Sequence, residues 1–264
     1  MRYTDHLQPE QVNGYLARLE LDPPISNDLE GLNRLLFAQL THIPFDSLDV
    51  WGAGLCPSLQ IRDLYEKIIV KKRGGYCFEL NTLFRGLLNA LGFDAYQCAA
   101  YILHADRPPE PPSHNVLLCP LQGKKYYLDV GYGGPVSYRA LELREGKQGE
   151  FLLKNEEGLW SLTRVTARET RPLTAFRDIP ASVTDLLPLN FYVSQHPDIH
   201  FRHVIHLNRR DPDGSLYALD GTQLKIRTGE KTEMIPVESI ARLKEILTAY
   251  YGIDPATVPL RDSL

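Results

Sequence analysis

The sequence predicts an α+β protein with three consecutive parts: a helical bundle, a central antiparallel sheet or small β-barrel, and a mixed α/β part. Apolar residues recur at helical spacing through the first ninety or so residues. From about Asp94 the pattern changes to short strand-like runs separated by turn residues, and the last third combines hairpins with one closing helix. We place the three parts at residues 1–92, 93–185 and 186–264, packed as one unit.

Four amphipathic helices are expected in the first part. The first covers residues 9–21, and the second and third begin at the capping residues Asn27 and Ser58. The fourth begins near Cys77 and ends at Gly92, since glycine is common at the position just after a helix. These helices should bury their apolar faces against one another.

The second and third parts contain the predicted strands. AYQCAAYIL leads into a proline-rich loop at 106–113, NVLLCPL and KKYYLDV flank a QG turn, and EFLLK and LWSLTRV flank NEEG. In the third part HVIHLN, SLYALD, QLKIRT and TEMIPV form a predicted meander of hairpins. A final helix is expected over residues 238–251, before Gly252.

Composition excludes several classes of function. The chain has 264 residues, a net charge of −4 and a pI of about 6.1, which indicates no nucleic-acid or anionic-membrane partner. Neither a secretory signal nor a membrane-spanning run is apparent, so we expect a cytoplasmic protein with reduced cysteines. No CxxC pair occurs, so no metal site is predicted. Cys56, Cys98 and Cys119 lie beside apolar residues and are expected to be buried and inert.

Cys77 stands apart, within the stretch RGGYCFELN. A helix N-terminus presents unpaired N–H groups and the positive end of the helix dipole, and both favour a thiolate. Gly74 and Gly75 allow a sharp turn into the helix, and Arg73 adds positive charge nearby. The stretch therefore predicts an activated cysteine, although a glycine turn leading into a core helix would look similar.

A cysteine nucleophile needs a base, and the base needs a residue that orients it. His114 begins the strand NVLLCPL, and Asp129 ends the next one. If residues 122–123 form a two-residue turn, His114 faces Gly131, and Asp129 lies diagonal to it on the same face. That diagonal is about 7–8 Å between Cα atoms, which the two side chains can bridge. A loop of odd length would break the arrangement.

The motifs RGGYCFELN, SHN and DVGYGG, in that order, resemble those of the arylamine N-acetyltransferase family, as does IPFDSLD at residues 43–49. The resemblance covers nearly the whole chain. It implies a helical bundle, a β-barrel and an α/β lid around a thiol-protease-like triad of Cys77, His114 and Asp129. It also implies a ping-pong reaction, in which an acetyl group moves from acetyl-CoA to Cys77 and then to an arylamine, arylhydrazine or N-hydroxyarylamine.

The resemblance assigns further residues to the site. The residues that match the acceptor pocket are Phe45, Phe78 and Tyr132, with core packing as the alternative. Gly131, Gly133 and Gly134 would let the CoA pyrophosphate approach the backbone, and Ser113 would contact the CoA arm. Arg73 and Glu79 would brace the site rather than react. No metal is implied, and the protein is expected to be a monomer or homodimer that acts in xenobiotic metabolism.

Three alternatives remain open. An amide synthase of natural-product biosynthesis would keep the triad and take its acyl group from a carrier protein. A thiol hydrolase would share the Cys–His–Asp order without the flanking motifs. A non-catalytic relic is disfavoured, because all three triad residues are present. The sequence does not name the natural acceptor or the preferred acyl-CoA.

Overall fold

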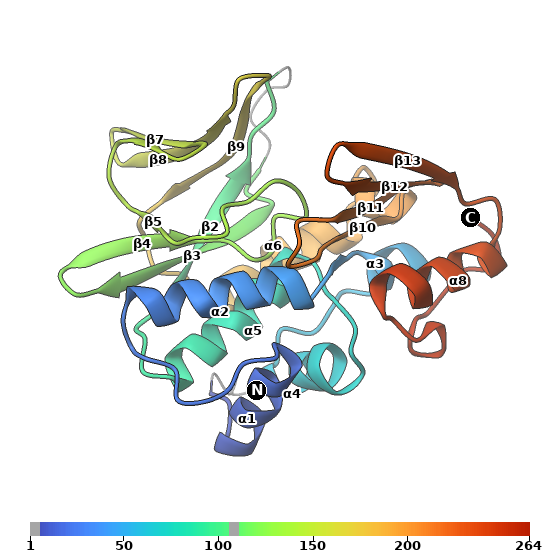
Figure 1. The fold of residues 1–264 in the computed structure, drawn as a ribbon, viewed down its shortest axis with the longest axis horizontal. Helices are drawn as coiled ribbons and strands as arrows, with labels where there is room; N and C mark the ends of the chain where they lie inside the picture. Colours follow the sequence, from blue (N-terminus) through green and yellow to red (C-terminus); the bar gives the residue numbers. More distant parts are fainter. Residues whose placement is uncertain (1–5, 106–110) are drawn as a thin grey trace.

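The structure is a computed structural model that describes residues 6–105 and 111–264. Most of the predicted proline-rich loop, at 106–110, lies outside the described residues. The early helices lie below the barrel in Figure 1, and a second sheet with its helix lies beside them. The α+β class and the order of helices, barrel and sheet with helix are as predicted.

The helices of the first part surround one central helix. They are α1 (Pro9–Arg18), α2 (Leu29–His42), α3 (Leu48–Ala53), α4 (Ile61–Tyr65), the π-helix η1 (Glu66–Val70) and α5 (Cys77–Ala90). Nearly every residue of α5 is buried, and its apolar side chains belong to the largest core cluster. Because α5 is held on all sides, the residue at its start has a fixed position.

Several predicted helix boundaries are wrong. Asp28 caps α2, because its carboxylate accepts the Gly31 N–H at 2.8 Å, whereas Asn27 donates to the Gly92 carbonyl at 2.6 Å. The residue before α4 is Gln60 rather than Ser58. Helix α1 ends at Arg18, and the short α3 was not predicted. At α2 the carboxylate of Asp28, rather than the side chain of Asn27, therefore accepts a hydrogen bond from the first turn of the helix.

The central sheet has eight antiparallel strands in the order β5-β4-β3-β2-β9-β8-β7-β6. They are β2 (Tyr96–Ile102), β3 (His114–Leu121), β4 (Lys124–Leu128), β5 (Leu141–Glu142), β6 (Gly146–Gln148), β7 (Phe151–Glu156), β8 (Leu159–Val165) and β9 (Thr170–Arg177). The side-chain amide of Gln148 joins the two edges, because it donates to the Glu142 carbonyl at 2.8 Å and accepts the Glu142 N–H at 3.0 Å. The sheet is therefore a nearly closed barrel.

The hairpin of β3 and β4 has the predicted register. Leu121 pairs with Lys124 and Leu117 with Leu128. Gln122 and Gly123 both have positive φ, at 51° and 76°, as a two-residue hairpin turn requires. The hairpin thus brings the start of β3 beside the residue that follows β4.

Strand β9 and helix α6 (Val183–Gln195) were not predicted. Strand β9 begins with Thr170, Arg171 and Pro172, and two polar residues followed by a proline obscure the strand pattern. Helix α6 carries Pro188 in its interior, which is a strong signal against a helix. The predicted boundary at 185/186 falls inside α6, and the division into three parts remains a prediction.

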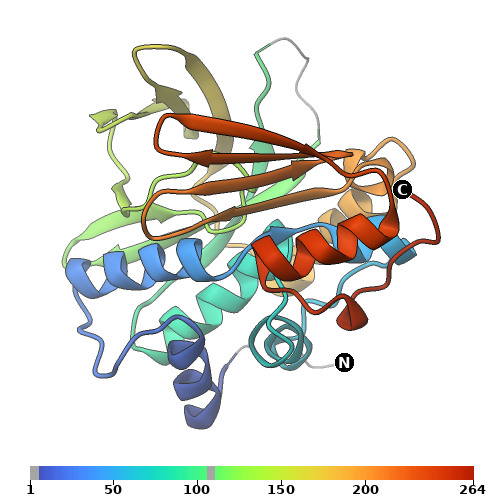
Figure 2. The same ribbon diagram turned by 45° about the vertical axis from the view of Figure 1, so that its right-hand side comes forward.

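The second sheet has the order β1-β10-β11-β12-β13 and joins the first part to the third. Its strands are β1 (Phe45–Asp46), β10 (His206–Arg210), β11 (Leu216–Asp220), β12 (Gln223–Thr228) and β13 (Lys231–Pro236). The predicted meander is thus confirmed, except that His203 lies in the short helix α7 (His200–His203). Helix α8 (Ile240–Tyr251) packs along this sheet, as Figure 2 shows, and shares a core cluster with it.

No helix among residues 6–105 and 111–264 is long and apolar enough to cross a membrane.

Candidate active site

Cys77 is the first residue of α5, as predicted. Tyr76 before it has an extended backbone (φ −97°, ψ −174°) and is the N-cap. The Cys77 side chain is buried, and its Sγ lies 4.0 Å from the Ser113 carbonyl oxygen, next to His114 in the chain. The helix start and the barrel strand β3 therefore meet at the cysteine.

His114 and Asp129 are in direct contact. The Nε2 atom of His114 lies 2.7 Å from Oδ2 of Asp129, and both side chains are almost fully buried. His114 pairs with Ala100 of β2, so the barrel holds its backbone on that side. Because Nε2 faces the carboxylate, Nδ1 is the ring nitrogen left for another partner. The contact predicted from the hairpin register is present.

The Asp129 carboxylate receives three further hydrogen bonds. Oδ1 accepts from Asn81 Nδ2 at 3.2 Å and from the Gly131 N–H at 2.9 Å. Oδ2 accepts from the Tyr127 hydroxyl at 3.3 Å. With His114, four donors fix the carboxylate, so its orientation is set from the helix, the strand and the following turn together.

Asn81 is a residue that the sequence analysis missed. It lies four residues after Cys77, one turn further along α5 on the same face. Besides its bond to Asp129, it donates to the Asn115 carbonyl at 2.7 Å and accepts the Val130 N–H at 3.1 Å. The i,i+4 spacing to the cysteine is the sequence signal that could have identified it.

The predicted lowering of the thiol pKa is wrong. Burial, and then the nearby charge of Asp129, raise the pKa of the Cys77 thiol well above its ordinary value. The N–H groups of Phe78 and of Cys77 itself act in the opposite direction, but they do not outweigh burial. The helix start alone therefore does not outweigh the effect of burial on the thiol pKa.

A cavity of about 740 Å³ opens onto Cys77 and His114. Six other residues predicted for the site also line it: Phe45, Ser113, Gly131, Tyr132, Gly133 and Gly134. Phe78 does not belong to the lining. It is fully buried and packs edge-on against Tyr76, with ring centroids 5.7 Å apart. For Phe78 the structure favours core packing, the alternative to a substrate contact.

Gly131 and Gly74 are glycines because the backbone passes close to other atoms. A Cβ at Gly131 would lie 2.6 Å from Cys77 Cα, and one at Gly74 would lie 2.1 Å from the Pro44 carbonyl oxygen. Neither Gly74 nor Gly75 has a positive φ, so the turn into α5 needs glycine for its close packing and not for a left-handed backbone. Gly74 and Gly131 both let the chain pack tightly around the start of α5.

The third part of the chain supplies cavity residues that the sequence did not indicate. Phe201 and His206 line the cavity, and their rings lie 5.8 and 5.5 Å from the Phe45 ring. His206 Nε2 lies 3.0 Å from the Gly133 carbonyl oxygen, so β10 contacts the glycine turn after Asp129. Only tertiary packing brings these residues together.

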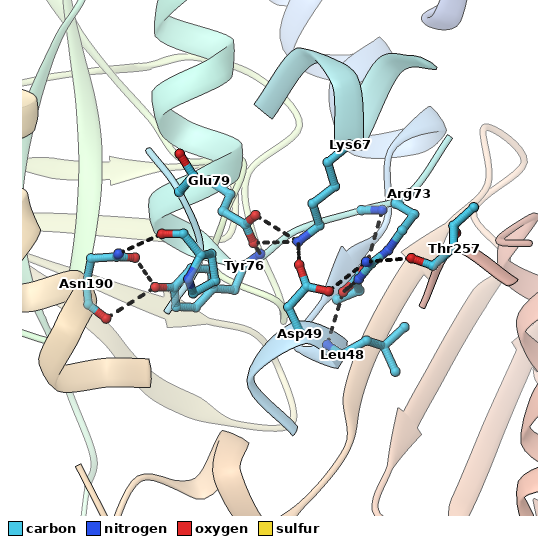
Figure 3. Close-up of polar contacts among 12 residues, drawn as sticks. Leu48, Asp49, Lys67, Arg73, Tyr76, Glu79, Asn190 and Thr257 are labelled. Carbon is cyan, nitrogen blue, oxygen red and sulfur yellow. Dashed lines mark hydrogen bonds and ion pairs between the residues drawn. The ribbon is translucent and has the colours of Figure 1, made fainter. Parts of the chain in front are cut away.

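Arg73 and Glu79 brace the turn before α5, as Figure 3 shows. Arg73 contacts Asp49 at 2.6 Å, Asp46 at 3.2 Å and the Thr257 carbonyl at 3.2 Å. Glu79 contacts Lys67 at 2.7 Å. The side chains of Arg73, Asp46 and Glu79 are each at most 4% exposed, so these are buried ion pairs rather than solvated ones.

Comparison with known proteins identifies the family. The N-acetyltransferase family model matches residues 28–257. An arylamine N-acetyltransferase of Mycolicibacterium smegmatis is 30% identical over 262 residues, covering 95% of this chain and 94% of the relative. An arylamine N-acetyltransferase/N-hydroxyarylamine O-acetyltransferase of Salmonella typhimurium is 29% identical over 92% of this chain and 88% of the relative.

Solved structures show the same fold. The arylamine N-acetyltransferase from Salmonella typhimurium has a TM-score of 0.86 at 28% identity, covering 94% of this chain and 92% of that chain. The Mycobacterium marinum enzyme in complex with CoA has a TM-score of 0.85 at 27% identity, covering 93% of both chains. The protein is thus of the acyltransferase class. It belongs to the arylamine N-acetyltransferase family.

Proposed function

We propose that this protein transfers the acetyl group of acetyl-CoA to an arylamine, arylhydrazine or N-hydroxyarylamine through an acetyl-Cys77 intermediate. One observation carries the proposal: Cys77 and His114 line the same cavity, and Asp129 holds Nε2 of His114 at 2.7 Å. That arrangement provides a nucleophile, a base and an orienting residue. Family membership supports the acyl chemistry, and the CoA complex of the Mycobacterium marinum relative supports the donor.

In the first half-reaction, the Cys77 sulfur attacks the acetyl carbonyl carbon of acetyl-CoA. Because burial keeps the thiol protonated, its proton moves to Nδ1 of His114 during the attack. The bond between the acetyl carbon and the CoA sulfur breaks, and His114 returns the proton to the CoA thiolate. The N–H groups at the start of α5 can stabilise the negative oxygen of the intermediate.

In the second half-reaction, the acceptor nitrogen attacks the acetyl-Cys77 carbonyl carbon. His114 removes a proton from the nitrogen and passes it to the departing Cys77 sulfur, which restores the free enzyme. Phe45, Tyr132, Phe201 and His206 offer ring faces and edges for an aromatic acceptor. Ser113, Gly133 and Gly134 are the proposed contacts for CoA. Gly131 also lines the cavity, but close packing against Cys77 already explains why a glycine stands there, because a Cβ would lie 2.6 Å from Cys77 Cα.

The test is intact-protein mass spectrometry after mixing with acetyl-CoA in the absence of an acceptor. We expect one added acetyl group, absent in the Cys77→Ala variant and removed by an aromatic amine such as 5-aminosalicylate. If the wild-type protein takes up no acetyl group, acetyl-CoA is not its donor. A carrier-bound acyl group would then replace it in the mechanism, as in an amide synthase.

A further inference from the structure

Five charged side chains lie beside the first turn of α5, and Figure 3 shows four of them with labels. They are Asp46, Asp49, Lys67, Arg73 and Glu79. Three carboxylates thus share two cations in a largely buried cluster. Arg73 forms ion pairs with Asp46 and Asp49, whereas Lys67 forms ion pairs with Asp49 and Glu79. The cluster therefore has two halves that meet at Asp49.

Glu79 ties the Lys67 half to the catalytic helix. Its Oε2 accepts the backbone N–H of Tyr76, the N-cap of α5, at 3.1 Å. The same carboxylate receives Lys67 Nζ at 2.7 and 3.0 Å. A buried carboxylate that caps a helix is thus held by a partly buried ammonium.

Lys67 is itself held at a second point. Its ammonium lies 2.8 Å from Asp49 Oδ2, and the other oxygen of Asp49 is bound by Arg73 at 2.6 Å. Lys67 belongs to η1, a π-helical turn that follows α4 directly. π-Helical turns are frequent at functional sites, where they redirect side chains. The geometry here places the ammonium between α3 and α5.

We propose that Lys67 and Glu79 form a positioning pair for the nucleophile. The pair fixes the Tyr76 N–H, and through it the direction in which the first turn of α5 presents Cys77 to His114. This inference rests on the proposed function, because it assigns the pair to the acylation of Cys77. Neither residue lines the cavity, so neither touches the substrate.

The other side of Tyr76 is already anchored. Its hydroxyl donates to the Asn190 side chain of α6, and Asn190 also donates to the Pro57 carbonyl at 2.9 Å. Asn190 therefore fixes the Tyr76 ring independently of Glu79, whereas the backbone N–H of Tyr76 depends on Glu79. A displacement of about 1 Å at the nucleophile can reduce a rate on the order of 100-fold. Control of the backbone at this position is thus relevant to the reaction rate.

Two double variants separate positioning from stability. Lys67→Met/Glu79→Gln keeps a side-chain oxygen that can accept the Tyr76 N–H, whereas Lys67→Met/Glu79→Leu does not. Both remove one cation and one carboxylate, so the formal charge of the cluster is the same in the two variants and in the wild type. Replacing a buried ion pair with apolar residues is often neutral or stabilising, so we expect both proteins to fold.

The measured quantity is the rate constant for acetylation of Cys77 in a single turnover, together with the acetyl-CoA concentration that gives half the maximal rate. We expect Cys77 to be acetylated at least about tenfold more slowly in the Lys67→Met/Glu79→Leu variant than in the Lys67→Met/Glu79→Gln variant. The half-saturating concentration of acetyl-CoA should be the same in both. Lys67→Arg, which keeps the cation, should remain close to wild type. Melting temperatures of all variants give the separate measure of stability.

Equal acetylation rates in the two folded double variants would overturn the proposal. So would a rate that follows melting temperature across the series, because a purely structural pair predicts that correlation. The matched control is Lys125→Met, which breaks the ion pair with Asp178 in the barrel and should leave the rate unchanged.

A second readout separates this proposal from the proposed function. Iodoacetamide labelling of Cys77, followed by peptide mapping, needs no acetyl-CoA. If the wild-type protein forms no acetyl adduct, the proposed donor is wrong, and the labelling rates of the same two double variants still decide the role of the pair. Peptide mapping is needed because Cys56 is exposed, contrary to the sequence-based expectation, and will also react.

Discussion

Asp129 is the residue on which the polar contacts of the site converge. It accepts hydrogen bonds from His114, Tyr127, Asn81 and the Gly131 N–H. Its charge also contributes to the raised pKa of Cys77, since a nearby anion disfavours a thiolate. In the proposed mechanism, Asp129 therefore orients the base and, at the same time, keeps the resting thiol of Cys77 protonated. Proton transfer to His114 is the proposed step that overcomes the raised pKa of the thiol.

The His114→Gln variant tests that reasoning at the residue scale. Without the imidazole, the thiol remains in an environment that raises its pKa, so its thiolate forms only at alkaline pH. In His114→Gln we expect the rate of Cys77 labelling by iodoacetamide to be low at pH 7 and to keep rising beyond pH 9. In wild type the rate should level off at lower pH, because His114 can take the proton of the thiol. Mapped rates across this range provide the measurement.

Cys98 and Cys119 are internal controls for the labelling experiment. Burial raises the pKa of Cys98 to about 12 and that of Cys119 to about 11, so both should react slowly in either protein. Identical pH profiles for Cys77 in wild type and His114→Gln would contradict the role of His114 as the base.

At the scale of elements, the site depends on how closely the turn after β4 approaches the start of α5. Gly131 follows Asp129 by two residues and packs against the Cys77 backbone. The helix supplies Asn81 to the same region, and its side chain bonds to both Asp129 and the Val130 N–H. The barrel and the helix are thus joined at the proposed catalytic residues.

Gly131→Ala should separate these two elements. The added Cβ would lie 2.6 Å from Cys77 Cα and 2.9 Å from the Cys77 carbonyl oxygen, so the backbone has to shift. We expect the free energy of unfolding to fall by roughly 1–3 kcal/mol and acetylation of Cys77 to slow. Urea denaturation and single-turnover acetylation measure the two effects.

Gly86→Ala provides the control on the same helix. Its Cβ would meet the Ile61 Cδ1 atom at 3.0 Å, which is the end of a flexible side chain, and alanine favours a helix. Little loss of stability or rate is expected there. An unchanged Gly131→Ala protein would show that the close approach is not required.

At the scale of the whole molecule, the buried charge cluster connects distant segments of the chain. Arg73 reaches Asp46 of β1, Asp49 of α3 and the Thr257 carbonyl near the C-terminus. Strand β1 in turn pairs with β10 of the second sheet. The turn that precedes Cys77 is therefore held by the first and third parts of the chain together.

The cluster also predicts how stability depends on pH. Burial, with the charges of Asp49 and Asp46, raises the pKa of Glu79 to about 7 although Lys67 opposes the shift. Because the folded protein binds this proton more tightly than the unfolded chain, stability should fall as pH rises from about 4.5 to about 7. This loss of stability follows from the direction of the shift. Urea denaturation at pH 5 and pH 8 measures it.

Glu79→Gln should remove most of this dependence, because glutamine does not titrate. The pKa of Asp49 is shifted in the opposite direction, to below its ordinary value, so its effect appears at more acidic pH and does not mask that of Glu79. An equal loss of stability from pH 5 to pH 8 in wild type and Glu79→Gln would contradict the assignment to Glu79.

The sequence by itself determined the features that depend on short-range geometry. Turn residues at 122–123 set the register of β3 and β4, and that register placed His114 beside Asp129. Helical periodicity located α5 with Cys77 at its start. Such features are predictable because they follow from the two-residue and 3.6-residue periods and from turn preferences, all of which act over a few residues.

Tertiary structure alone decided the rest. The contact of Asn81 with Asp129, the pair of Lys67 and Glu79, and the place of His206 in the cavity each join segments far apart in the sequence. The raised pKa of Cys77 likewise comes from burial by other elements, which outweighs the local effect of the helix start. No short-range pattern specifies these contacts, because they depend on how the packed helices, barrel and second sheet face one another.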